Sequence, residues 1–162
     1  TLNDVTLPAE NRRDLSAFQE KIGRLQSAIR TMNGRLNNSS KELQDMRAAA
    51  QGIKTDNSKI LMGIDLAEQK IAKIQRKLNG ERLAYRLDID LPPSISDRVN
   101  RAAYGVLSSS SAPTNTQRDA YKIASSDFQP LEKELNSFID NDMKRIIDML
   151  TRSDAPYTIN RK

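Results

Sequence analysis

Apolar residues recur three and four positions apart along the first third of the chain, the spacing that places them on one face of a helix. They fill both seam positions of a heptad repeat, with one polar member: Leu15, Phe18, Ile22, Leu25, Ile29, Met32, Leu36, Ser39, Leu43, Met46 and Ala50. The phase continues across the polar residues 37–40, although Ser39 and Glu42 also match a capping box. A loop has no reason to preserve phase, so we predict one helix over residues 9–51.

A second apolar stripe follows after a short break, at Ile60, Ile64, Ala67, Ile71, Ile74 and Leu78. Between the stripes, Gly52 before Ile53 is typical of a Schellman helix end, in which glycine takes the left-handed conformation. Residues 55–58 supply candidate N-caps for a helix over residues 57–79. Because so short a turn makes consecutive helices antiparallel, the sequence predicts a long coiled-coil-like hairpin.

Asn79-Gly80 marks the expected end of the second helix, with a resumption through residues 82–86 as an open alternative. Residues 87–91 alternate apolar and acidic side chains. Alternation is typical of a strand, but no partner strand is evident. We therefore expect an extended connector whose apolar residues pack against the bundle.

Two further helices are expected, over residues 94–109 and 115–152, followed by an irregular tail over residues 153–162. Ser94 is the expected N-cap of the third helix. Pro130 lies inside the fourth apolar pattern and has no backbone N–H, so it is expected to kink or divide that helix after Gln129. The methionines, including Met62, are expected to fill the core.

The predicted fold class is therefore all-α: an elongated antiparallel bundle of four helices in a single domain over residues 1–162. Only 37% of the residues are hydrophobic, and six glycines and six prolines suit long helices around narrow seams. No apolar run is long enough to cross a membrane. The chain starts without Met and without a signal peptide, so we expect a fragment of a larger protein.

The chain carries a formal net charge of +5, and most of the excess lies in the first two helices. A candidate basic patch consists of Lys70, Lys73, Arg76 and Lys77. Such a patch fits a nucleic acid or an anionic surface, but it also fits an ordinary solvated helix face with charges of both signs. We favour the solvated face, because no aromatic side chains are interleaved for base stacking.

Catalytic chemistry has little support in the sequence. Without Cys or His the chain has no thiolate nucleophile, no common zinc ligand and no side chain of near-neutral pKa. Asp140 and Asp142 are two positions apart on one helix and diverge. Asp88 and Asp90 lack the other oxygen ligands of a calcium loop. Phosphate-binding glycine motifs are absent. We expect no catalytic residue, no metal site and no cofactor.

Three motifs of the second half are more specific: Pro-Ser-Ile-Ser-Asp-Arg-Val at 93–99, Ala-Pro-Thr at 112–114, and Ala-Pro-Tyr-Thr at 155–158 with Arg161. Their order and spacing resemble the C-terminal helical region of bacterial sortilin-like, sialidase-type (BNR-repeat) β-propeller proteins, often called glycosyl hydrolases. In that family the tail usually reads Pro-Trp-Thr-Pro-Gly-Arg. Here Tyr157 stands in place of the tryptophan, and Ile159-Asn160 in place of Pro-Gly.

The resemblance implies an exported protein (periplasmic, cell-surface or secreted) in which any carbohydrate chemistry belongs to an upstream propeller. Our hypothesis is a non-catalytic packing or protein-interaction domain, whose partner is that propeller or a second copy of the chain. Helices three and four look too short to cover the whole hairpin. The candidate interaction surface is therefore the far end of the first stripe, at Leu15, Phe18, Ile22, Leu25 and Ile29. The alternative is a basic helical module that binds nucleic acid or an anionic surface.

Overall fold

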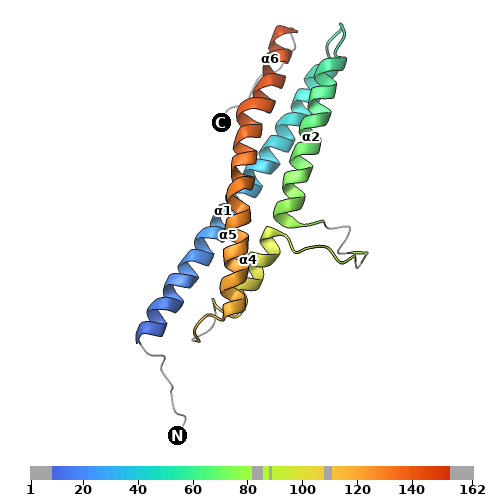
Figure 1. The fold of residues 1–162 in the computed structure, drawn as a ribbon. Helices are drawn as coiled ribbons and strands as arrows, with labels where there is room; N and C mark the ends of the chain where they lie inside the picture. The colour runs from blue at the N-terminus through green and yellow to red at the C-terminus, as the bar shows by residue number, and fades with distance from the viewer. Residues whose placement is uncertain (1–8, 82–85, 88, 108–110, 154–162) are drawn as a thin grey trace. The chain divides into compact units, whose positions relative to one another are not determined.

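The computed structural model describes residues 9–81, 86–87, 89–107 and 111–153, and these residues form helices without any strand (Figure 1). The helices are α1 (Ala9–Gln51), α2 (Ser58–Asn79), α4 (Ile95–Ala103) and α5 (Asn115–Ser137), the last continued directly by the π-helical η1 (Phe138–Met143) and by α6 (Lys144–Arg152). The predicted all-α class with four helices is confirmed. The expectations for residues 82–85, for Asp88, for residues 108–109 of the third helix and for the tail from residue 154 onward lie outside the described residues.

Both predicted stripes form the core. Every member of the α1 stripe is buried, including Ser39 at 4% exposure, and all six members of the α2 stripe are buried as well. α1 continues through residues 37–40 without a break. Burial of the seam on both sides of this polar stretch outweighs the local capping tendency of its Asn and Ser residues, because most helical stability comes from packing of the apolar face.

The described chain divides into two compact units. Unit 1 comprises Thr1–Thr31 and Lys77–Gln129, and unit 2 comprises Met32–Arg76 and Pro130–Lys162. α1 contributes its first part to unit 1 and the rest to unit 2. The long fourth helix is shared in the same way, with the boundary at Pro130. A heptad stripe carries no mark of such a boundary, since its phase is the same on both sides.

Unit 1 has an aromatic centre on α1. Phe18 packs in a buried cluster with Leu15, Ile22, Ala102, Val106 and Ala120. The ring of Tyr121 meets Phe18 edge to face, with centroids 5.7 Å apart. The guanidinium of Arg118 lies 5.4 Å from the Phe18 ring centroid and also bonds the carboxylate of Asp14. α4 and α5 thus close over this part of the α1 stripe.

Capping side chains define the helix starts in unit 1. Ser94 and Asp97 form the predicted capping box at α4, and Thr114 and Gln117 exchange equivalent bonds at α5. α4 ends at Ala103, whereas the expected helix ran to residue 109.

The early end of α4 has a local cause. Gly105 takes a φ of 76°, which breaks the helix. Side-chain amides then serve the freed carbonyls: Gln19 donates to Val106 O at 2.8 Å and Gln117 donates to Tyr104 O at 2.9 Å. Both carbonyl oxygens therefore keep a hydrogen-bond donor after the helix ends.

The connector before α4 does not pack as expected. Leu87, Ile89 and Leu91 are 60%, 53% and 47% exposed, and the described residues there are neither helix nor strand. The expectation that these side chains cover the bundle is wrong. The seam of unit 1 is already filled by the apolar faces of α4 and α5, which leaves the connector without a surface to cover.

The helical hairpin of unit 2 turns through residues 52–57. The N–H of Gly52 bonds the carbonyls of Ala48 and Ala49 at 3.3 and 3.1 Å, but its φ is not positive, so the expected left-handed glycine is wrong. Instead, the side-chain amide of Asn57 donates to Ala50 O at 2.9 Å. The N–H of Ile53 bonds the same carbonyl at 3.2 Å, so Asn57 adds a second donor that ties the end of α1 to the start of α2. At the end of α2, Gly80 does take the left-handed conformation.

The fourth helix is not divided at Pro130, which lies within α5. The irregularity comes later, in η1. The buried face places Phe138 and Met143 five residues apart, a gap that an α-helix cannot keep on one side. A π turn takes about one more residue per turn, so it keeps both side chains buried.

Candidate docking groove

Unit 2 contains an open groove between α2 and the η1–α6 segment, with a volume of about 850 Å³. Its lining runs along α2 from Lys59 to Arg76, which corresponds to about 25 Å at 1.5 Å per residue. The opposite wall is shorter and comes from Asp142, Arg145, Ile146 and Met149. Side chains from α2, η1 and α6 of unit 2 therefore face one hollow.

The floor of the groove is apolar. We use the word floor for the large apolar side chains of the lining: Met62 and Leu66 from α2, which are 64% and 55% exposed, and Ile146 and Met149 from α6. Gly63 lies between them, and a Cβ there would meet Met149 Cε at 3.3 Å. The missing side chain allows α6 to approach α2 closely and leaves the exposed pair beside the hollow.

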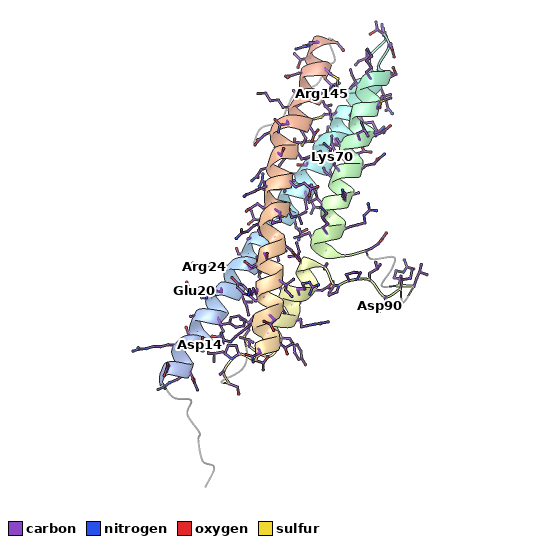
Figure 2. The ribbon with its side chains drawn as sticks, viewed as in Figure 1. Asp14, Glu20, Arg24, Lys70, Asp90 and Arg145 are labelled. Atoms are coloured by element: carbon purple, nitrogen blue, oxygen red, sulfur yellow. The ribbon has the colours of Figure 1, made fainter. Side chains whose placement is uncertain are left out.

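The rim of the groove is cationic. Its charged members are one carboxylate, Asp142, and five basic side chains: Lys59, Lys70, Lys73, Arg76 and Arg145. Lys70 Nζ lies 2.8 Å from Asp142 Oδ2 with both side chains substantially exposed, so this pair adds little stability. Within the described residues, no ion pair engages the other four basic side chains. Figure 2 labels Lys70 on α2 and Arg145 on α6.

A second charged network fixes α2 on α1 within unit 2. Arg47 bonds Asp65 Oδ1 at 2.5 Å and both carboxylate oxygens of Glu68, at 3.3 and 2.9 Å. The hydrogen bond that Arg47 donates to Asp65, followed by those it donates to Glu68, raises the pKa of Arg47 above its already high value. The network holds the hairpin on the side of α2 that carries Asp65 and Glu68, and neither carboxylate lines the groove.

Three members of the predicted basic patch, Lys70, Lys73 and Arg76, line the groove, whereas Lys77 does not. Sequence reasoning missed the apolar floor. Met62 was expected in the core, and the structure exposes it. The missed signal was the spacing of Met62 and Leu66: they are four residues apart, hence on one helix face, and neither belongs to the buried stripe.

The five residues of the predicted interaction surface do not form an open face. Leu15, Phe18, Ile22, Leu25 and Ile29 are between 0% and 8% exposed in unit 1. The first three pack against α4 and α5. The expectation that the shorter helices leave this end uncovered is therefore corrected, because their small residues Ala102 and Ala120 let them approach the stripe closely.

The acidic residues considered for catalysis or metal binding are dispersed. Asp142 pairs with Lys70, and Asp90 is exposed on the connector. Among the described residues, no group of three or more acidic side chains could hold a metal ion. None of the described helices is long and apolar enough to span a membrane.

Comparison with known proteins finds no match among family models, curated proteins or solved structures. Two of the three motifs behind the family resemblance have a local structural role: Ser94 and Asp97 cap α4, and Thr114 caps α5. The geometry of the groove is therefore the main basis for a functional proposal.

Proposed function

We propose that this chain is a non-catalytic helical module for protein–protein contact, and that the groove between α2 and α6 is its docking face. The observation that carries the proposal is the exposure of Met62 and Leu66 beside a hollow with a basic rim. Large apolar side chains gathered in one exposed patch are typical of interaction sites. Methionine suits such a surface, because its flexible side chain adapts to different partners.

The concave form of the groove favours a protein partner. A flat bilayer is best met by apolar side chains that project beyond the charged ones. A hollow with an apolar floor is instead filled by inserted side chains, as in grooves that accept peptide segments. The cationic rim adds specificity and speeds the encounter with acidic partners.

A displayed library of random peptides, selected on the immobilised chain, tests this function. We expect enriched peptides whose binding is lost in Leu66→Glu and kept in Ile123→Glu. The two changes are matched, since both residues are partly exposed aliphatic residues on helices, and Ile123 lies in unit 1. Circular dichroism is used to check that both variants fold. If no enriched peptide depends on Leu66, the proposed function is wrong.

The basic rim favours a second candidate, the binding of an anionic surface or nucleic acid. Lys70, Lys73 and Arg76 follow one another along α2, and Arg145 faces them from α6. No aromatic side chain lines the groove, which weakens the case for nucleic acid. Salt-sensitive co-sedimentation with phosphatidylserine vesicles, or a shift of duplex DNA at low salt, would support this candidate. Absence of both at low salt would remove it.

We further propose that the module belongs to a larger exported protein with an upstream propeller of the sortilin-like BNR-repeat type. The support is the order of the three motifs, of which the last lies outside the described residues. The full reading frame of the gene tests this proposal, since propeller repeats upstream are expected. A glycoside hydrolase assay of the chain by itself is expected to be blank.

A further inference from the structure

The connector of unit 1 presents a second unexplained apolar feature. Leu87, Ile89 and Leu91 are all about half exposed or more, within five residues, and they alternate with acidic residues in the sequence. Asp90 is exposed and is labelled on this segment in Figure 2. No described helix of unit 1 needs these side chains for its core, because the α1 stripe there is already buried.

The connector and the groove are complementary in chemistry. The connector offers aliphatic side chains with acidic neighbours, and the groove offers an aliphatic floor with a rim of five basic side chains against one carboxylate. The lengths also agree: a fully extended five-residue segment spans about 14 Å from its first to its last Cα, which fits within the roughly 25 Å of lining along α2. Long Lys and Arg side chains can keep their stems on the apolar floor while their charges reach a carboxylate above it.

We propose that the connector side chains Leu87, Ile89, Asp90 and Leu91 of one copy of the chain dock in the α2–α6 groove of a second copy. This proposal rests on the proposed function, in which the groove is a docking face for a protein. It identifies that protein as a second copy of the same chain. Leu87, Ile89 and Leu91 lie on Met62, Leu66 and the α6 wall. Asp90 lies among the rim cations.

Such an interface is heterologous, because the groove of one copy meets a different surface of the next. Head-to-tail contacts of this kind produce rings when they close and open chains when they do not. A five-residue segment buries far less than a standard interface, so the association is weak and depends on concentration. It also weakens with salt, since its charged rim is exposed.

Sedimentation velocity of mixed variants tests the proposal. Leu66→Glu removes the groove and keeps the connector, whereas Ile89→Lys removes the connector and keeps the groove. Each variant alone is expected to be monomeric at concentrations where the unaltered chain forms dimers and larger species. An equal mixture of the two is expected to form dimers and nothing larger, because only one productive contact remains.

A labelled peptide of residues 86–93 gives an independent readout. Its fluorescence anisotropy on the Ile89→Lys chain is expected to show saturable binding, with a dissociation constant at least tenfold higher on a chain that also carries Leu66→Glu. Ile123→Glu serves as the matched control and leaves binding unchanged. Met62→Glu, at a more exposed position of the same floor, replaces Leu66→Glu if that variant does not fold.

A monomeric unaltered chain at all concentrations, or a mixture that stays monomeric, would overturn self-docking. The function proposed above then stands or falls separately: library peptides that need Leu66 without resembling residues 87–91 would keep the groove as a docking face for another protein. Loss of both results would remove the docking face itself.

Discussion

The two units treat the same α1 stripe differently. In unit 1 the stripe is covered by α4 and α5, and its Phe18 ring meets the edge of Tyr121 and lies beneath the Arg118 guanidinium. In unit 2 the stripe faces the apolar stripe of α2, and α2 carries a second apolar pair, Met62 and Leu66, outside it. The comparison shows that the buried stripe accounts for the fold. The candidate docking site is marked instead by apolar residues that do not belong to the stripe.

The largest expected effect is in unit 1. Phe18→Ala removes a 5%-exposed ring together with its contacts to Tyr121 and Arg118, so it should lower the free energy of unfolding by about 3–5 kcal/mol. Chemical denaturation followed by circular dichroism measures the loss. The partly exposed Ile123→Ala should stay within about 0.5 kcal/mol of the unaltered chain. A loss below about 1 kcal/mol for Phe18→Ala would contradict the aromatic centre.

Glycine replacements sharpen the comparison along α1. A Cβ added at Gly23 in unit 1 or at Gly34 in unit 2 would meet no heavy atom within 4 Å, so alanine at either should raise the free energy of unfolding by about 1 kcal/mol. Gly63→Ala should gain less, because its methyl would meet Met149 Cε at 3.3 Å. Thermal and chemical denaturation of the three variants give the order. Equal gains at all three would contradict the close approach of α6.

The Arg47 network distinguishes unit 2 by its dependence on salt. Arg47→Met keeps an apolar stem of similar length and removes the bonds to Asp65 and Glu68, so we expect a loss of about 0.5–1 kcal/mol. The loss should shrink at about 1 M salt, where charges are strongly screened. Arg24→Met, which removes an exposed pair with Glu20, should cost less. If the loss of unfolding free energy in Arg47→Met is the same at high salt, then Arg47 stabilises the hairpin by packing and not by its charge.

The smallest expected effect concerns pH at the turn of unit 2. Hydrogen bonds from the side chain and backbone of Ser58 hold the pKa of Asp56 below its ordinary value of 3.8. The carboxylate therefore stabilises the folded chain above pH 3.8, and this contribution is lost as the pH falls through the lowered folded-state pKa. Asp56→Ala should lower the Tm at neutral pH, with a difference that vanishes in acid. Ser58→Ala, which keeps the backbone donor, should lie between.

Sequence patterns predicted much of the fold because the seams are local and periodic. The α1 and α2 stripes, the Ser94 cap and the end of α2 at Gly80 all follow from residues within a few positions of each other. The π turn was not predicted, because Ile139 lies four residues before Met143 and keeps an ordinary helical spacing in the sequence. The division expected after Gln129 is wrong, because α5 continues through Pro130.

The candidate site was only half predictable. The basic residues Lys70, Lys73 and Arg76 stand out in the sequence, but their role as a rim depends on Ile146 and Met149, which are some seventy residues away. The apolar connector was misjudged, because alternation alone does not say whether a core still has room for Leu87, Ile89 and Leu91.

The sequence by itself determined the class of fold, the buried stripes and most helix ends. These features depend on residues three and four positions apart, which lie next to each other on one helix face. Only the tertiary structure decided which apolar residues stay outside. Leu15 to Ile29 are covered and Met62 and Leu66 are not, because exposure depends on which distant element reaches a helix face. That is a question of packing between segments, and periodicity along one segment does not contain the answer.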